Sequence, residues 1–144
     1  MKVVVQRSNS SSVSVDNKVV GKIDNGLVLL VGFTDESDKN EIDYMVNKIV
    51  NLRIFDDEAG IMNKSILDVG GAILSISQFT LYADTKKGNR PSYTKALNGK
   101  IAEPLYNLFN QKLSQYVHVE TGIFGAEMIV NIENDGPITI ILER

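Results

Sequence analysis

The apolar run at residues 27–31 restricts the fold more than any other part of the sequence, because a strand built from it needs cover on both faces. Such a run is typical of a central, buried strand. Residues 2–7, 12–15 and 18–23 have the alternating patterns of half-buried strands. Turn-forming residues at 16–17 separate the second of these from the third. We therefore expect an antiparallel meander that leads into the central strand.

Apolar residues at helical spacing predict two helices, over residues 37–52 and 101–116. Pro104 is compatible with the second helix, because a proline in the first turn has no intrahelical hydrogen bond to lose. Further strands are expected over residues 72–79, 126–132 and 138–142, with a turn at residues 134–137 joining the last two. The sequence thus predicts an α+β fold: a mostly antiparallel sheet with two principal helices packed against it.

The composition is that of an ordinary globular protein. With 144 residues, of which 43% are hydrophobic and 23% charged, residues 1–144 are expected to form a single domain. The absence of cysteine excludes a disulfide framework, thiolate metal ligands and a cysteine nucleophile. No segment approaches the roughly 20 apolar residues that cross a bilayer, and the first apolar run is too short for a signal peptide. We expect a cytoplasmic protein with no membrane contact.

The net charge of −3 argues against nonspecific coating of nucleic acid, yet the charges are segregated. Between Asp84 and Glu103 the charged residues are all basic: Lys86, Lys87, Arg90, Lys95 and Lys100. Acidic residues gather at 35–38 and 56–58 instead. This pattern is compatible with an RNA backbone lying across the basic segment, and an ordinary solvated loop explains it equally well.

Metal, triad and nucleotide chemistry find little support. His118 is the only histidine, and no residue near it has the spacing of a second metal ligand. No nucleophile elbow accompanies it, and Gly70 with Gly71 lacks the spacing of a phosphate-binding loop. We therefore expect no metal and no other cofactor, which leaves the polypeptide backbone as the main source of chemistry.

Two short motifs carry most of the functional information. Residues 77–81 read serine, glutamine, phenylalanine, threonine and leucine, so polar groups stand where an apolar strand ends. Backbone amides freed at such a position are suited to stabilise a developing oxyanion. Residues 134–139 read asparagine, aspartate, glycine, proline, isoleucine and threonine. Taken singly, each motif also fits a structural role, as a polar strand end or a tight turn.

Together the two motifs resemble the signatures of the D-aminoacyl-tRNA deacylases, the bacterial-type enzymes formerly called D-tyrosyl-tRNA deacylases. Further stretches agree with that family, in its order, at residues 6–7, 52–55, 88–93 and 121–126. The resemblance covers essentially the whole chain. The departures, at Ser8, Tyr93 and Asn98, lie outside both signatures.

The resemblance implies a homodimeric enzyme that hydrolyses the ester linking a D-amino acid, or glycine mischarged onto alanine tRNA, to the terminal ribose. In the family a cis Gly-Pro bond of one subunit enters the active site of the other, which assigns this role to Gly136 and Pro137. Their carbonyl oxygens are expected to clash with an L side chain and to admit the D isomer, since selectivity between enantiomers needs built-in repulsion. Arg7 is the expected support of this dipeptide.

The same resemblance gives the catalytic residues as Ser77, Gln78, Phe79 and Thr80. We expect amides around Phe79 and Thr80 to bind the ester carbonyl oxygen. The Thr80 hydroxyl is either a nucleophile or a group that orients water, and orientation is favoured because no base is evident to activate it. The neighbouring ribose hydroxyl of the tRNA is then the candidate for proton transfer.

Lys86, Lys87 and Arg90 are the candidate RNA-binding residues. Three alternatives stay open at this point. The chain is a noncatalytic tRNA-binding module, a threonine-nucleophile hydrolase of small esters, or a purely structural dimer.

Overall fold

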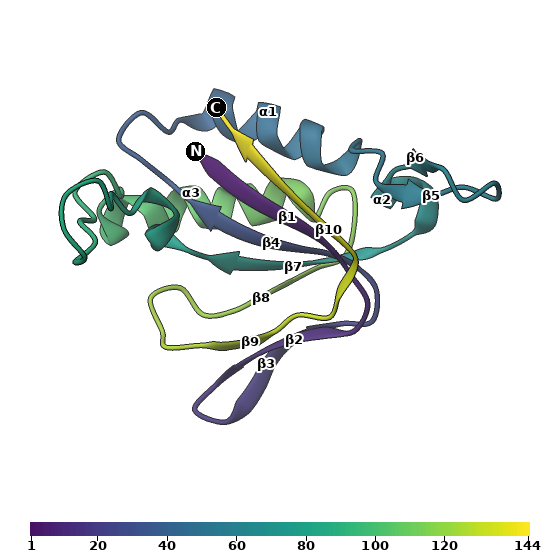
Figure 1. Cartoon of the computed structure of the whole chain (residues 1–144), viewed down its shortest axis with the longest axis horizontal. Coiled ribbons are helices and arrows are strands. Elements are labelled where there is room, and N and C mark those ends of the chain that lie inside the picture. The colour runs from purple at the N-terminus through teal and green to yellow at the C-terminus, as the bar shows by residue number, and fades with distance from the viewer.

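The computed structural model describes all residues from 1 to 144, and it is organised around one five-stranded sheet (Figure 1). The strand order is β10–β1–β4–β7–β8. The bounds are Lys2–Ser8 for β1, Gly26–Gly32 for β4, Ala72–Ser77 for β7, Val119–Thr121 for β8 and Asn134–Glu143 for β10. β1 pairs antiparallel with β10 and β4, whereas β4, β7 and β8 run parallel to one another. This main sheet is therefore mixed.

Both faces of the main sheet are covered, as the apolar run of β4 requires. The helices α1 (Lys39–Val50) and α3 (Gly99–Leu113) pack on one face and share a large hydrophobic core with β1, β4 and β7. A small antiparallel sheet, in the order β3–β2–β9, covers part of the other face. Its strands are Ser11–Val15 (β2), Lys18–Ile23 (β3) and Ile129–Asn131 (β9). Val28 of β4 and Leu74 of β7 are fully buried between the two sheets.

The remaining elements are short and lie at the two ends of the main sheet. At one end, on the right of Figure 1, are a hairpin of β5 (Phe55–Asp56) and β6 (Met62–Lys64) and the single turn α2 (Ile66–Val69). At the opposite end, a 3₁₀ turn, η1 (Phe79–Tyr82), follows β7 directly. A long loop then leads to α3.

The expected fold class is confirmed: two principal helices pack on a sheet system in which most strand pairs are antiparallel. Local signals explain where the helices begin. The side chain of Asp38 accepts a hydrogen bond from the Glu41 amide at the start of α1, and Asn98 accepts one from Lys100 at the start of α3. No helix is long and apolar enough to cross a membrane.

The expected meander is wrong. β1 pairs directly with β4, while β2 and β3 form a hairpin in the second sheet. The alternating patterns identified the strands, but a pattern with one buried face does not say which sheet provides the cover.

Several boundaries also differ from the prediction. β7 ends at Ser77, two residues before the predicted end, and η1 begins at Phe79. α3 begins at residue 99, which puts Pro104 beyond the first turn, inside the helix. The motif at 134–137 is not the turn between two late strands, because it belongs to β10 itself.

Candidate active site

A largely apolar cavity of about 540 Å³ opens at the carboxyl end of β7, next to the end of the parallel strand β4. Parallel strands end at a common edge of the sheet, where backbone groups run out of ladder partners. The first turn of α3 and the segment between β8 and β9 form the other walls. The lining residues that matter most below are Ser77, Gln78, Phe79, Tyr93 and Phe124.

Phe124 is held in the cavity wall by Tyr106 of α3. The two rings pack with centroids 5.7 Å apart. The Tyr106 hydroxyl donates a 2.7 Å hydrogen bond to the carbonyl of Ser75 in β7. Burial raises the pKa of Tyr106, which keeps the phenol protonated and able to donate. One tyrosine therefore couples the cavity wall to the strand that leads into the first motif.

The first motif leaves the sheet abruptly. The Gln78 amide donates a 2.7 Å hydrogen bond to the carbonyl of Val31, and η1 begins at the next residue with no side-chain cap. The first amides of a helix have no acceptor within it. The N–H groups of Phe79, which lines the cavity, and of Thr80, the residue after it, are therefore left unused by η1.

Gln78 controls the hydroxyl of Thr80. Its side-chain nitrogen donates to the Thr80 oxygen at 2.5 Å, so that oxygen is an acceptor and its own proton is free to be donated elsewhere. Thr80 itself is not among the cavity-lining residues and is connected to the cavity through Gln78. No carboxylate or imidazole contacts the hydroxyl, so no side chain is placed to remove its proton.

The cavity holds no formal charge. Its lining contains no aspartate, glutamate, lysine, arginine or histidine. His118 lies at the opposite end of β7, where its carbonyl accepts from Ile73, and its ring is 70% exposed beside Glu120. No cluster of metal-ligating side chains occurs in the structure. With no charged side chain in the lining, backbone N–H groups are the main hydrogen-bond donors available to a substrate in this cavity.

The second motif forms a bulge in β10. The ladder between β1 and β10 is regular up to Gln6, but then Arg7 alone faces residues 135–138 before pairing resumes. Gly136 has a φ of +117°, a backbone conformation that residues other than glycine rarely adopt. A Cβ on Gly136 would lie 2.8 Å from Cγ1 of Ile138. The peptide bond between Gly136 and Pro137 is cis.

Arg7 lies opposite this bulge in β1 and is only 9% exposed. Its guanidinium donates to the carbonyl of Ile54 at 3.0 Å and to the Asp56 carboxylate at 3.4 Å. Its Nε lies 3.0 Å from the Asp135 carboxylate, at an angle that makes the contact an ion pair and not a hydrogen bond. The predicted support of the dipeptide by Arg7 is therefore indirect, since Arg7 holds Asp135, the residue before Gly136.

Within one chain the two motifs lie at opposite ends of the main sheet (Figure 1). Arg7, beside the bulge, is level with Ile73 at the start of β7, whereas the cavity begins at Ser77. Four residues along the strands and three strand spacings across them give a separation of roughly 20 Å. One copy of the chain cannot bring Gly136 into its own cavity.

The basic segment is the loop between η1 and α3, next to the cavity. Lys86, Lys87 and Arg90 are exposed and form no ion pair. Asp84 organises the loop, and the backbone hydrogen bond that it accepts from Lys86 lowers its pKa, assisted by the charge of Lys95. Tyr93 of this loop packs edge-on against Phe79, with centroids 5.2 Å apart, so two half-exposed aromatic rings stand at the cavity mouth.

Comparison with known proteins decides the family. The model of the family described as D-Tyr-tRNA(Tyr) deacylase matches residues 4–143. The chain belongs to this family.

Two relatives from Limosilactobacillus reuteri strains, each named D-aminoacyl-tRNA deacylase, are 59% identical over the full length of both chains. Deacylases are hydrolases, so the chain is an enzyme. A solved structure titled c-Myc DNA Unwinding Element Binding Protein is 42% identical, with a TM-score of 0.95 over 100% of this chain and 99% of that one. A structure titled as a probable eukaryotic D-amino acid tRNA deacylase is 17% identical but has a TM-score of 0.84 over 98% of this chain and 97% of that one, so the fold is shared.

Family membership makes the location of each predicted residue informative. Ser77, Gln78 and Phe79 line the cavity, with Thr80 one hydrogen bond away. The sequence reading missed the part played by Asp56 and Asp135, which flank Arg7. Asp56 had only the signal of an acidic turn, because 49 residues separate it from Arg7.

Proposed function

We propose that this deacylase hydrolyses the ester bond of D-aminoacyl-tRNA, and of glycine mischarged on alanine tRNA, while rejecting L-aminoacyl-tRNA. The observation that carries the proposal is an uncharged cavity lined by Phe79, at the start of a 3₁₀ turn whose first amides have no helical acceptor, in a chain of this family. An ester carbonyl gains negative charge during hydrolysis, and unused amide donors are the groups that stabilise such charge. In this proposal the cavity and the loop between η1 and α3 belong to a single deacylase domain, residues 1–144.

In the hydrolytic step, the amides of Phe79 and Thr80 bind the carbonyl oxygen as charge develops. Removal of one such donor has cost about 3–4 kcal/mol where it has been measured in another enzyme. Gln78 fixes the Thr80 hydroxyl as an acceptor, so this hydroxyl orients water instead of attacking the ester. With no side-chain base in the cavity, the free hydroxyl of the terminal ribose relays a proton from the attacking water to the ribose oxygen that leaves the ester. Ser77 shapes the pocket, and no metal or cofactor takes part.

Chiral rejection uses the second motif of another copy of the chain. The roughly 20 Å between the motifs supports a homodimer in which Gly136 and Pro137 of one subunit complete the cavity of the other. Their carbonyl oxygens meet an L side chain, whereas a D side chain points away and glycine has none. A thousandfold preference needs only about 4 kcal/mol, which a rigid backbone pressed against a carbon atom supplies.

The tRNA meets the loop beside the cavity. Lys86, Lys87 and Arg90 are exposed and free to contact phosphates. Phe79 and Tyr93 offer stacking surfaces for the unpaired 3′ end of the RNA, which leads the ester into the cavity. Such a substrate places the enzyme in the cytoplasm.

Deacylation of matched D-tyrosyl-, L-tyrosyl- and glycyl-tRNA tests the proposal. The expected result is rapid release of D-tyrosine and glycine, with L-tyrosyl-tRNA left intact. Retention of tRNA without release of any amino acid would identify a noncatalytic tRNA-binding module. A trapped acyl group on Thr80 would identify a threonine-nucleophile hydrolase.

Mixed dimers test the shared site. Gly136→Ala damages the bulge, and Ala96→Trp fills the cavity, so each variant alone is expected to lose most of the wild-type activity. If one subunit completes the other's cavity, unfolding and refolding the two together restores about a quarter of the wild-type activity, because half of the dimers then contain one intact site. No restoration would show that both motifs must act within one chain.

A further inference from the structure

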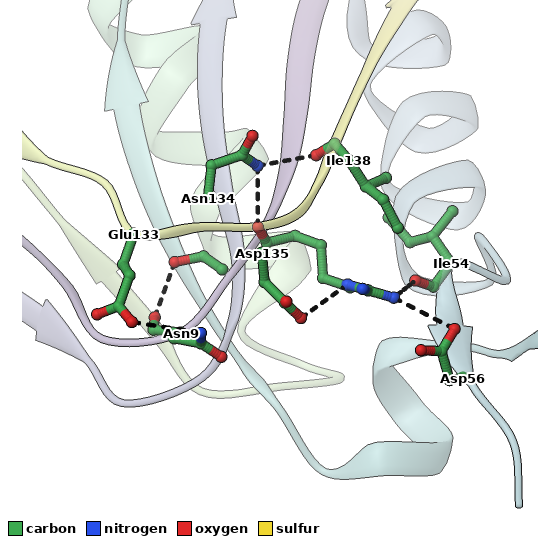
Figure 2. A network of polar contacts seen from close by, with 9 residues as sticks. Asn9, Ile54, Asp56, Glu133, Asn134, Asp135 and Ile138 are labelled. Carbon is green, nitrogen blue, oxygen red and sulfur yellow. Dashed lines mark hydrogen bonds and ion pairs between the residues drawn. The ribbon is translucent and has the colours of Figure 1, made fainter. Parts of the chain in front are cut away.

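The bulge that carries Gly136 and Pro137 is closed at its base, between residues 134 and 138, which we call its neck. The side-chain nitrogen of Asn134 donates one hydrogen bond of 3.0 Å to the carbonyl of Arg7 in β1, and another of 3.0 Å to the carbonyl of Ile138 (Figure 2). The first bond holds the bulge to the neighbouring strand. The second joins its beginning to its end. A single amide thus replaces the ladder that β10 lacks between residues 134 and 138.

Both polar atoms of this amide are hydrogen-bonded. Both nitrogen-bound hydrogens point at carbonyl oxygens, and the side-chain oxygen accepts from the Thr139 hydroxyl at 3.3 Å. The Thr139 oxygen in turn accepts from the side-chain nitrogen of Gln6 at 3.2 Å. A reversed amide would set its oxygen against two carbonyl oxygens, so the pattern itself fixes the orientation.

Both ends of the neck are anchored in rigid parts of the molecule. Arg7 belongs to β1, whose neighbours Val5 and Val3 are fully buried in the main core. Ile138 packs against the same core. The two bonds of Asn134 therefore hold both ends of the segment that carries the Gly136 and Pro137 carbonyls.

We infer that Asn134 is a positioning residue for chiral discrimination, which sets how far the Gly136–Pro137 backbone projects from the sheet. This rests on the proposed function, in which that backbone excludes L isomers. The role differs from that of Arg7, which holds the bulge through the Asp135 carboxylate. Asn134 touches neither substrate nor the reacting ester in this arrangement. Its contribution is to selectivity.

Asn134→Asp tests the inference with nearly the same shape. The carboxylate has no hydrogen to donate and faces two carbonyl oxygens, so the neck opens. The ratio of kcat/KM for L-tyrosyl-tRNA to that for D-tyrosyl-tRNA is expected to rise at least tenfold. An equal loss on D-tyrosyl-, L-tyrosyl- and glycyl-tRNA, with that ratio unchanged, would overturn the inference.

Asn9→Asp is the matched control. Asn9 lies beside the same bulge, but its amide contacts only the exposed Glu133 carboxylate at 3.4 Å (Figure 2). Both substitutions add one negative charge in the same region, so any general effect on RNA binding is shared. The control is expected to keep the wild-type ratio. A tenfold change of the ratio in Asn9→Asp as well would attribute the effect to charge and overturn the inference.

A neutral variant separates positioning from folding. In Asn134→Ser the serine side chain is too short to make both hydrogen bonds of the neck, and it carries no charge. This variant is also expected to raise the ratio of kcat/KM for L-tyrosyl-tRNA to that for D-tyrosyl-tRNA. Thermal unfolding and gel filtration confirm that each variant is a folded dimer before it is assayed. If the wild-type protein itself does not discriminate between D and L esters, the proposed function fails. If the wild type discriminates and both Asn134 variants keep its ratio, only the role of Asn134 fails.

Discussion

The cavity at the end of β7 and the bulge at the start of β10 are built in opposite ways. The cavity has no charged residue and leaves the amides of Phe79 and Thr80 without a helical partner. The bulge rests on a buried arginine with two carboxylates and on an asparagine whose every polar atom is bonded. In the cavity, backbone N–H donors without a partner can bind the negative charge that develops on the ester oxygen. At the bulge, by contrast, both side-chain N–H donors of Asn134 are bonded to carbonyl oxygens, and the wall is held in place.

Gly136→Ala breaks the bulge side of this comparison and is expected to have the largest effect. The added Cβ has no room beside Ile138, and φ of +117° is strained for alanine. Strain of roughly 1–3 kcal/mol corresponds to a loss of about 10- to 100-fold in kcat/KM, for D-tyrosyl- and glycyl-tRNA alike. Gly60→Ala is the control, because Gly60 also has a positive φ, of +75°, but no atom lies within 4 Å of the position that its Cβ would take. Unchanged rates in Gly136→Ala would remove Gly136 from the site.

Arg7→Lys tests how the bulge is held, because it keeps the positive charge and removes the planar guanidinium. A lysine ammonium cannot reach the Ile54 carbonyl and both carboxylates at once, because it lacks the planar fork of the guanidinium. We expect a loss of about tenfold in kcat/KM for D-tyrosyl-tRNA and a Tm lower by several degrees. Glu143→Gln, which breaks an exposed ion pair with Lys2, should leave both values nearly unchanged. A wild-type Tm in Arg7→Lys would mean that the three contacts of Arg7 do not stabilise the bulge.

Thr80→Ala tests the cavity side. If the hydroxyl only orients water, the rate constant of hydrolysis in single-turnover assays falls by only about tenfold, because the backbone amides remain. Thr80→Ser keeps the hydroxyl and should restore most of the rate. A loss of several thousandfold in Thr80→Ala, together with a trapped acyl intermediate in the wild type, would instead make Thr80 a nucleophile.

Charge removal in the loop beside the cavity is expected to have the smallest effect on chemistry. The double variant Lys86→Gln, Lys87→Gln should lower the slope of log affinity for tRNA against log salt by about 1–2 units and leave the D-to-L ratio unchanged. The control removes two exposed lysines of β3, Lys18 and Lys22, and should keep the slope. An unchanged slope in the loop variant would locate the RNA-binding surface elsewhere.

Several features of the fold follow from local patterns. The run of β4 predicted a strand with cover on both faces, and it is the middle strand of the main sheet, with helices on one side and a second sheet on the other. The spacing of apolar residues predicted α1 and α3 to within a few residues. Hydrophobic periodicity reports which face of an element is buried, and that information is contained in neighbouring residues.

The site was only partly predictable. The polar groups after β7 pointed to a strand end, and three of the four predicted catalytic residues line the cavity there. The position of Phe124 in its wall, the three contacts of Arg7 and the closure of the bulge by Asn134 were not predicted. Each depends on residues that are distant in sequence or on a bulge whose register the β1–β10 ladder decides.

The sequence by itself determined the chemistry available to this protein: no thiol, a single histidine, and two polar motifs next to apolar strands. These are properties of residue types, and no folding is needed to establish them. Only the tertiary structure decided that one motif borders an uncharged cavity while the other lies at the far end of the same sheet. Strand order and register arise from packing between distant segments, and no local pattern encodes the distance between two sites.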